Sequence, residues 1–221
     1  MRRVLVLRPE PGASATVKRA RERGLETVAV PLFEIERVAW EAPDAAGFDG
    51  LLLTSANAVR HGGEAIAKLR GLPVYAVGDA TAEAARGAGF DVAATGDVGM
   101  DRLLGSIEGG LRLLHLCGED RREPSEPSHR ITALPVYRAK PLEKPGLSAA
   151  RGAVALIHSP RAGRRFAELV DDRGSIAIAA ISAAAAEAVG IGWQSVETAE
   201  APSDEALLAL AARLCDNPAP K

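Results

Sequence analysis

Small and hydroxyl-bearing residues recur in this sequence directly after short apolar runs. Thr54 and Ser55 follow one run, Gly78 follows another, and Ser159 and Ser182 follow two more. In open α/β sheets, ligands bind beyond the carboxyl ends of the strands, where the first N–H groups of each following helix lack a partner within that helix. Such N–H groups bind anions. These positions therefore predict recognition of carboxylate or phosphate groups at the strand ends.

The candidate binding positions share one property, which is that they directly follow a predicted strand. They are Arg8, Thr54, Ser55, Ala56, Asn57, Gly78, Asp79, Ala80, Thr81, Ser159, Pro160 and Ser182. A second interpretation stays open, because serine and threonine are also preferred at helix N-caps, where they stabilise the helix without binding a ligand. Likewise, Gly78 could serve only a tight turn, and Arg8 could be a surface charge beside Pro9.

Sequence motifs for several kinds of catalysis are missing. The chain has no G-x-x-x-x-G-K loop for a nucleotide and no G-x-S-x-G turn for a serine nucleophile. Its four histidines are scattered without the spacing of metal ligands, and Cys117 and Cys215 are isolated. We therefore expect no metal ion, no bound nucleotide and no disulfide, and we expect a reducing compartment.

The elements that would position these residues are short apolar strands alternating with alanine-rich helices. Near-continuous apolar runs between helices are typical of parallel sheets covered on both faces. The sequence therefore predicts the α/β class. The predicted strands are 4–7, 26–30, 50–53, 73–77, 111–116, 153–157 and 175–180.

Glycines mark the ends of three predicted helices, at residues 16–23, 56–70 and 80–86. Glycine is favoured just after a helix because it adopts positive φ without strain. Gly62-Gly63 lies inside the second helix and weakens that prediction. Residues 119–129 contain two prolines among charged residues, so we expect a loop where the alternation would place a helix.

An internal repeat divides the chain into two similar halves. In each half, an extended segment of proline, an apolar residue and an aromatic residue precedes a strand, a hydroxyl residue at its end, and a helix. The matching segments lie 104 residues apart, which is the signature of a duplicated structural unit. They are 31–33 and 135–137, 53–55 and 157–159, and 77–78 and 181–182.

Two segments have the alternating polar and apolar pattern of exposed strands, 32–39 and 133–138. If the first domain begins before one segment and resumes after the other, the two segments can pair as a hinge. The predicted organisation is two similar parallel-sheet α/β domains joined by a two-stranded antiparallel hinge, with a cleft between the domains. The first domain is then discontinuous, 1–31 plus 139–221, and the second is 40–132.

Composition excludes several classes of function. The 221 residues carry 27 basic and 29 acidic side chains, and this net charge of −2 does not favour a surface for polyanions. Four Phe, two Tyr and two Trp are too few for the stacking surfaces of a single-strand nucleic-acid binder. The N-terminus lacks a signal-peptide core, and no apolar run is as long as a membrane span. We expect a cytoplasmic monomer that binds neither nucleic acid nor membrane.

Four short motifs follow one another along the chain: Leu7-Arg8-Pro9, Leu53-Thr54-Ser55-Ala56-Asn57-Ala58-Val59, Val77-Gly78-Asp79-Ala80-Thr81-Ala82 and Leu134-Pro135-Val136-Tyr137. Together they resemble the uroporphyrinogen-III synthase family. The resemblance implies two α/β domains and a cofactor-free lyase of tetrapyrrole and heme biosynthesis. In that reaction hydroxymethylbilane loses its terminal hydroxyl as water, ring D is inverted through a spiro intermediate, and the macrocycle closes as uroporphyrinogen III.

The resemblance also implies a catalytic role for Tyr137, which matches the family's tyrosine at the end of the second linker strand. A phenol with a pKa of about 10 stays protonated at neutral pH and can donate a proton to the departing hydroxyl. The alternative is that Tyr137 only packs in the hinge, like its repeat mate Phe33. The strand-end positions would bind the acetate and propionate arms of the substrate. The second half departs from the family, because Ala185 stands where many members have threonine. Either a hydroxyl is dispensable there, or Ser182 takes its place.

A second class of function stays open. A hinged pair of α/β domains also describes non-catalytic two-lobed proteins that bind small ligands or regulate other processes, since a fold does not fix a function. Such a binder would need no tyrosine at the hinge. A pair of phosphorylated receiver domains fits less well, because the sequence lacks their acidic cluster and lysine at strand ends.

Overall fold

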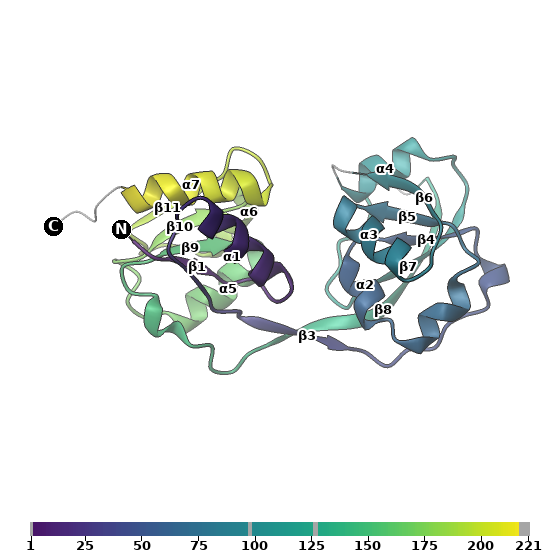
Figure 1. Cartoon of the computed structure of the whole chain (residues 1–221), viewed down its shortest axis with the longest axis horizontal. Coiled ribbons are helices and arrows are strands. Elements are labelled where there is room, and N and C mark those ends of the chain that lie inside the picture. Colours follow the sequence, from purple (N-terminus) through teal and green to yellow (C-terminus); the bar gives the residue numbers. More distant parts are fainter. Residues whose placement is uncertain (1, 97–98, 126–127, 217–221) are drawn as a thin grey trace. The chain divides into compact units, whose positions relative to one another are not determined.

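The computed structural model of the chain describes residues 2–96, 99–125 and 128–216. The chain divides into two compact units. The discontinuous unit, Met1–Glu34 with Pro141–Lys221, is unit 1, and the continuous unit, Ile35–Lys140, is unit 2. The chain passes between the units twice, through the segments that Figure 1 labels β3 (Phe33–Arg37) and β8 (Arg130–Pro141).

Unit 1 contains a five-stranded parallel sheet with the strand order β11-β10-β9-β1-β2. Parallel neighbours require a crossover between strands, and the helices of this unit provide it. The strands are β1 (Val4–Val6), β2 (Thr27–Ala29), β9 (Val154–Ile157), β10 (Ala177–Ala180) and β11 (Ser195–Thr198). The helices are α1 (Gly12–Glu22), α5 (Pro160–Leu169), α6 (Ala183–Ala188) and α7 (Asp204–Asp216), and a 3-10 helix spans Leu147–Ala149.

Helices cover both faces of this sheet. Val4 and Val6 point to one face and belong to a core cluster with apolar residues of α1 and α7. On the other face, Gly163 of α5 lies against Ile157 of β9 and Ala185 of α6. A Cβ at Gly163 would come within 3.1 Å of the Ala185 carbonyl oxygen, so the missing side chain permits this close packing of the two helices. Burial on both faces explains the near-continuous apolar runs of these strands.

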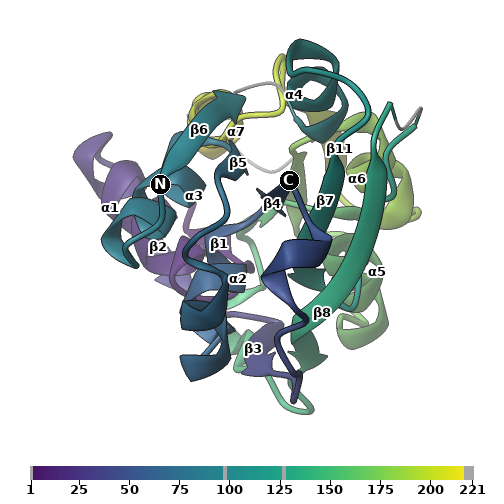
Figure 2. The same ribbon diagram turned by 90° about the vertical axis from the view of Figure 1, so that its right-hand side faces the viewer.

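The second sheet has six strands in the order β3-β8-β7-β4-β5-β6, and the five from β8 to β6 are parallel. Figure 2 turns unit 2 toward the viewer, and the labels from β8 to β6 can be followed across it. The further strands are β4 (Gly50–Leu53), β5 (Val74–Val77), β6 (Val92–Gly96) and β7 (Arg112–Gly118). The helices are α2 (Ala56–His61), α3 (Asp79–Gly87) and α4 (Met100–Ser106), with 3-10 helices at Ala45–Gly47 and Glu64–Leu69.

Alternate residues of the central strand β4 divide the core of unit 2. Leu51 and Leu53 pack with α2, α3 and the second 3-10 helix, whereas Leu52 packs with Leu103 and Leu104 of α4. The carboxyl ends of the strands therefore lie between two layers of helices, where ligand sites of open α/β sheets occur. In either unit, no helix of the described residues is both long enough and apolar enough to cross a membrane.

The segments β3 and β8 run antiparallel to each other. The N–H of Val38 donates to the Val136 carbonyl at 3.0 Å, and the N–H of Leu142 donates to the Leu32 carbonyl at 2.9 Å, so one residue number rises as the other falls. The predicted linker 133–138 lies inside β8, which also pairs in parallel with β7. This segment is therefore a full member of the six-stranded sheet and not part of an isolated two-stranded ladder.

The two halves of the internal repeat form sheets with the same strand order. Without β3, the second sheet reads β8-β7-β4-β5-β6, and the first sheet reads β2-β1-β9-β10-β11. The segments that lie 104 residues apart occupy the same places, because β4 matches β9 and β5 matches β10. All seven predicted strands are present, with ends that shift by up to two residues. Two edge strands, β6 and β11, were not predicted, because their mixed polar sequences lack an apolar run.

The predicted helix 56–70 was too long. It is interrupted after α2, where Gly63 has a φ of 61°, and resumes as a 3-10 helix. This positive φ favours glycine, and the Arg37 guanidinium lies where a Gly63 side chain would stand. The predicted loop 119–129 contains no helix in the residues that the structure describes, and residues 126–127 lie outside that description.

Candidate active site

Tyr137 lies half-buried near the end of β8 in unit 2. Burial raises the pKa of its phenol, while hydrogen bonds with the Ser55 hydroxyl and from the Gly118 backbone N–H act in the opposite direction. Gly118 ends the neighbouring strand β7, and a Cβ there would lie only 2.8 Å from Cε2 of the Tyr137 ring. The tyrosine is therefore protonated at neutral pH and lies across a strand end that has no side chain of its own.

Ser55 and Thr54 follow β4 and place two hydroxyls beside Tyr137. Ser55 caps α2, because its Oγ accepts a hydrogen bond from the N–H of Asn57 at 3.2 Å. Oγ1 of Thr54 lies 3.0 Å from Nε2 of His115, a buried residue of β7. Burial lowers the pKa of His115 to about 4, and the charge of Arg121 acts in the same direction. At neutral pH, Thr54 is therefore held by an uncharged imidazole.

A cavity of about 190 Å³ opens at this edge of the sheet. It joins the predicted residues Tyr137, Thr54 and Ser55 to side chains of both charges from α4 and from the loop after β7. The lining residues are Thr54, Ser55, Met100, Asp101, Gly118, Asp120, Arg121, Arg122 and Tyr137. This cavity, which we call the Tyr137 cavity, combines a protonated phenol, hydroxyls and cations, and can therefore bind an anionic group beside a proton donor.

The loop after β7 was not among the predicted site residues. Its cations, Arg121 and Arg122, reach the cavity because β7 ends at the centre of the edge formed by β8, β7 and β4. The adjacent acidic residues favoured a solvated loop in the sequence, and this concealed the site. The signal that could have identified it is the position of two arginines three and four residues after a buried strand.

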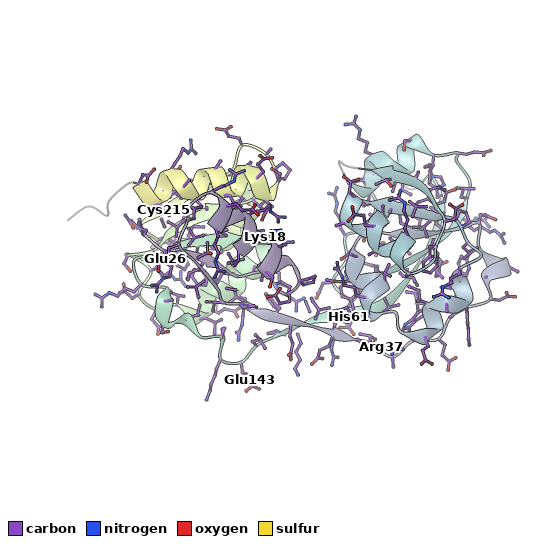
Figure 3. All side chains as sticks on the ribbon, viewed as in Figure 1. Lys18, Glu26, Arg37, His61, Glu143 and Cys215 are labelled. Carbon is purple, nitrogen blue, oxygen red and sulfur yellow. The ribbon has the colours of Figure 1, made fainter. Side chains whose placement is uncertain are left out.

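The ring of His61 lies 6.3 Å from the Tyr137 ring, measured between centroids, with an angle of 40° between the planes. His61 ends α2 and is labelled in Figure 3. Burial lowers its pKa, and the charge of Arg60 adds to this effect, so the imidazole is neutral at neutral pH. His61 thus bounds Tyr137 with an uncharged ring and was another residue that sequence reasoning missed.

The turn into α3 depends on the conformation of Gly78 and buries the predicted binding residue Thr81. Gly78 adopts a φ of 83°, which requires glycine, and Asp79 and Ala80 lie at the helix start. Thr81 is neither an N-cap nor an exposed side chain, because it lies inside α3 with only 5% of its surface accessible. The Thr81 hydroxyl as a ligand contact stays a prediction, and its burial does not favour it. Its repeat mate Ala185 is fully buried as well, so the threonine missing there would not reach solvent.

Two further predicted residues have mainly structural environments. Ala56 is buried at the start of α2, and Asn57 contributes its N–H to the Ser55 cap. Neither of them lines the Tyr137 cavity, nor do the residues of the α3 turn. The predicted positions of unit 2 thus separate into those beside Tyr137 and those at the α2 and α3 helix starts.

In unit 1, the predicted hydroxyls are N-caps. Oγ of Ser159 accepts from the N–H of Ala162 at 3.1 Å, and Oγ of Ser182 accepts from the N–H of Ala185 at 3.3 Å. Pro160 takes the first position of α5, which suits its lack of an N–H. These residues are half-buried at the strand ends, so a ligand can still contact them although they cap helices.

Arg8 is no isolated surface charge, because it belongs to a polar cluster around Asp204 of α7. Its Nη1 lies 3.6 Å from Oδ1 of Asp204 and donates to Oγ1 of Thr16 at 3.5 Å. Asp204 also accepts hydrogen bonds from Thr16 at 2.9 Å and from Nε of Arg19 at 2.8 Å, and its Oδ1 lies 2.9 Å from Nε2 of His158. These partners hold the pKa of Asp204 far below its usual range despite burial, which raises it. The cluster fixes the guanidinium of Arg8 at the carboxyl end of β1.

A larger hollow of about 830 Å³ lies on unit 1 along α1 and β2. Lys18, labelled in Figure 3, is one of its lining residues, and none of the predicted site residues lines it. The Tyr137 cavity is therefore the better candidate.

Comparison with known proteins gives consistent results. A family model described as uroporphyrinogen-III synthase HemD matches residues 14–209. A stretch of 61 residues is 43% identical to the uroporphyrinogen-III synthase of Chlorobaculum parvum (strain DSM 263 / NCIMB 8327). That stretch covers 27% of this chain and 25% of the relative, so the alignment spans a quarter of the relative's length.

Two solved structures resemble the whole chain. The uroporphyrinogen-III synthetase of Helicobacter pylori 26695 matches with a TM-score of 0.66 and 21% identity, covering 97% of this chain and 100% of its own. A mutant uroporphyrinogen III synthase of the extremely thermophilic bacterium Thermus thermophilus matches with a TM-score of 0.54 and 18% identity, covering 98% of this chain and 100% of its own. At these identities the likeness establishes the fold, a mixed α/β architecture with parallel-dominated sheets.

Proposed function

We propose that this chain, which belongs to the uroporphyrinogen-III synthase family, cyclises hydroxymethylbilane to uroporphyrinogen III with inversion of ring D and release of water. The resemblance predicted from the four motifs agrees with the family match over residues 14–209. The observation that carries the proposal is the position of Tyr137, a protonated phenol at a cavity lined by hydroxyls and arginines. A cyclisation that begins with loss of a hydroxyl needs such a proton donor.

Tyr137 acts on the departing hydroxyl of the substrate. As the C–O bond of the terminal hydroxymethyl group breaks, the phenol gives its proton to the oxygen, which leaves as water. The remaining azafulvene cation is attacked by the substituted carbon of ring D, which forms the spiro intermediate. The bond from that carbon to the bridge carbon of ring C then breaks, and the released bridge carbon bonds to the free α-carbon of ring D, so that ring D is inverted and the macrocycle closes. Hydrogen bonds from Ser55 and Gly118 stabilise the phenolate that forms. The proton that is lost when the last pyrrole ring becomes aromatic again restores the phenol.

Positioning of the substrate contributes more than acid strength. The azafulvene is stabilised by resonance, so the difficult step is to fold a flexible four-ring chain such that ring D attacks through one carbon. We assign the acetate and propionate arms to the strand-end positions in both units. In unit 2 the N–H groups of Asp79 and Ala80 open α3 and have no acceptor in the described part of the chain. In unit 1 Arg8 supplies a fixed cation at the end of β1. Backbone and cluster donors thus allow a chain of net charge −2 to bind a polyanion.

The experiment that tests this proposal is an isomer analysis. Hydroxymethylbilane is supplied under anaerobic conditions, the products are oxidised, and the uroporphyrin isomers are separated. Isomer III in excess over the enzyme-free control is expected. Isomer I alone, which forms spontaneously, would exclude the activity and would favour a non-catalytic two-lobed binding protein.

We further propose that β3 and β8 act as a two-stranded hinge between the units. The two segments are the points where the chain passes from one unit to the other, and they are joined by backbone hydrogen bonds. A smaller radius of gyration in solution scattering with uroporphyrin III than without it is expected. An unchanged radius at saturating ligand would exclude closure.

The state of the protein in the cell completes the proposal. We propose a cytoplasmic monomer that needs no cofactor and binds neither nucleic acid nor membrane, as its near-neutral charge and sequence indicate. Sedimentation equilibrium should give the mass of one chain, 23.0 kDa. A stable dimer at micromolar concentration would contradict the first part.

A further inference from the structure

The Tyr137 cavity is too small for a whole tetrapyrrole. Its volume is about 190 Å³. Four pyrrole rings exceed this volume, whereas a single acetate or propionate arm fits within it. The charges that line the cavity therefore face one arm and the reacting end of the substrate, not the whole molecule.

Arg122 already forms an ion pair within the protein. Its Nη2 lies 3.0 Å from Oδ2 of Asp101. The N–H of Ser125 donates to Oδ1 of Asp101 at 2.8 Å, and the Ser125 hydroxyl donates to Oδ2 at 3.0 Å. These contacts lower the pKa of Asp101 and tie the loop after β7 to the start of α4. Arg122 and Asp101 thus neutralise each other and fix the loop, and Asp120 also has an interaction partner.

Arg121 has a weaker partner. Its guanidinium lies 2.8 Å from Oε1 of Glu123, whose side chain is 65% exposed and does not line the cavity. The Arg121 side chain is only 30% exposed. Exposed ion pairs stabilise proteins little, so a carboxylate that enters the cavity can replace Glu123. The planar guanidinium suits this exchange, because it can donate two parallel hydrogen bonds to one carboxylate.

The charge of Arg121 changes the pKa values of buried side chains in β7. It lowers the pKa of His115, which is hydrogen-bonded to Thr54, and opposes the burial that raises the pKa of the Cys117 thiol. His115 and Cys117 both belong to β7 and are buried. The charge of this guanidinium therefore acts on buried groups of β7, the strand whose end, Gly118, lines the Tyr137 cavity.

The two sheets carry arginines at equivalent places. β7 lies next to β4 in unit 2, just as β1 lies next to β9 in unit 1. Arg8 follows β1 by two residues, and Arg121 follows β7 by three. Both side chains are partly buried, with 35% of Arg8 and 30% of Arg121 exposed. The duplicated architecture thus repeats a cation at the same strand end, although the sequence repeat does not align these residues.

We propose that Arg121 binds one carboxylate arm of the substrate in the Tyr137 cavity and so determines which end of the chain meets Tyr137. This inference rests on the proposed function. Arg121 exchanges Glu123 for the arm, while Arg122 and Asp101 keep the loop in place. The arm is held next to the departing hydroxyl, and the guanidinium contributes to binding of the substrate before any bond breaks.

Steady-state kinetics with hydroxymethylbilane test the role of Arg121. For Arg121→Gln, we expect a KM raised about tenfold or more with kcat changed less than about threefold, because a charged hydrogen bond in the ground state is lost. Arg121→Lys should recover part of this loss. Arg102→Gln removes the same charge from an exposed position on α4 and should leave KM within about twofold. Glu123→Gln should lower KM by up to about fivefold, since the competing pair is removed.

Each contrary result has a definite meaning. An Arg121→Gln variant with an unchanged KM overturns the inference, and so does an equal rise in KM for Arg102→Gln, which would indicate long-range attraction only. A fall in kcat at constant KM would place Arg121 in the transition state and also overturn ground-state binding.

Equilibrium binding of uroporphyrin III, an oxidised probe with the same carboxylate arms, separates this inference from the proposed function. If the wild type forms only isomer I but binds the probe in an Arg121-dependent way, the synthase activity fails and the carboxylate site stands. If isomer III forms and probe affinity does not depend on Arg121, the site fails and the activity stands. Folding of every variant is checked by circular dichroism.

Discussion

The hydroxyl of Tyr137, on β8, is hydrogen-bonded to the hydroxyl of Ser55, which follows β4, although β7 lies between these two strands. The tyrosine ring crosses the end of β7 at Gly118, where a Cβ would lie 3.0 Å from Cζ of the ring. Three adjacent strand ends thus form this arrangement. β8 carries the phenol, Ser55 after β4 is its hydrogen-bond partner, and Gly118 of β7 leaves the space between them. The arrangement holds the phenol at a fixed place in the cavity.

Removal of the Tyr137 hydroxyl tests proton donation directly. Tyr137→Phe should lower kcat about 100-fold or more, because general acid catalysis typically contributes that much. The share of isomer I in the product should rise, since the spontaneous cyclisation then competes. The unfolding midpoint should change little, as the ring and its packing remain. Tyr75→Phe, in the other core cluster of unit 2, is the matched control and should keep wild-type kcat. Equal kcat values for the two variants would remove Tyr137 from the mechanism.

A methyl group at Gly118 tests the space beneath the tyrosine. Gly118→Ala places a Cβ 2.8 Å from Cε2 of Tyr137, so the ring must move. We expect kcat to fall about 10- to 100-fold through misplacement of the phenol. The free energy of unfolding should fall by about 1–3 kcal/mol, as for other overpacked sites. Gly71→Ala is the control, because nothing lies within 4 Å of its Cβ position. Full activity of Gly118→Ala would show that the ring position is unimportant.

Ser55 has two roles that can be separated. Ser55→Ala should destabilise the fold by about 1 kcal/mol through loss of the α2 cap. Ser203→Ala should cost the same, because its Oγ accepts from the N–H of Ala206 at 3.2 Å and caps α7 without contacting the site. Only Ser55→Ala should also lower kcat, by about 2- to 10-fold, since the phenol loses a hydrogen bond. If both variants have wild-type kcat at equal loss of stability, Ser55 is a cap and nothing more.

The central strands could be predicted because burial on both faces leaves an apolar run, as in Leu51, Leu52 and Leu53. The repeat then linked the two halves, and the paired strand orders agree with it. The edge strands β6 and β11 were missed because one-sided exposure permits polar residues. The predicted helix 56–70 was overextended because Gly63 adopts a φ of 61°, which ends the helix, and a glycine within a helical pattern does not by itself reveal that conformation.

The site was predicted in part for similar reasons. Thr54, Ser55 and Tyr137 belong to local motifs and converge on the Tyr137 cavity. Thr81 belongs to a local motif too, but it is buried within α3, and no local pattern distinguishes the inner from the outer side of one helical turn. Arg121 and Arg122 were missed because a charged loop is normally solvated, and only the order of β8, β7 and β4 brings it to the phenol.

The Asp204 cluster predicts how unit 1 responds to acid. The pKa of Asp204 in the folded protein lies far below its value in the unfolded chain. The carboxylate therefore stabilises the fold at pH values above the unfolded pKa of about 4, and this stabilisation is lost as the pH falls further. Asp204→Asn removes the charge at every pH. We therefore expect the variant to be less stable than the wild type by about 1–3 kcal/mol at pH values near about 7, a loss typical of a partly buried group with charged partners.

The difference in free energy of unfolding between the wild type and Asp204→Asn should shrink as the pH falls from about 5 toward about 2, because the wild type then loses the same interaction. Denaturant titrations across this range measure it. Asp172→Asn changes a carboxylate outside the cluster and should leave the difference from wild type near zero at all pH values. A constant difference between wild type and Asp204→Asn down to low pH would mean that the geometry of the cluster matters and the charge of Asp204 does not.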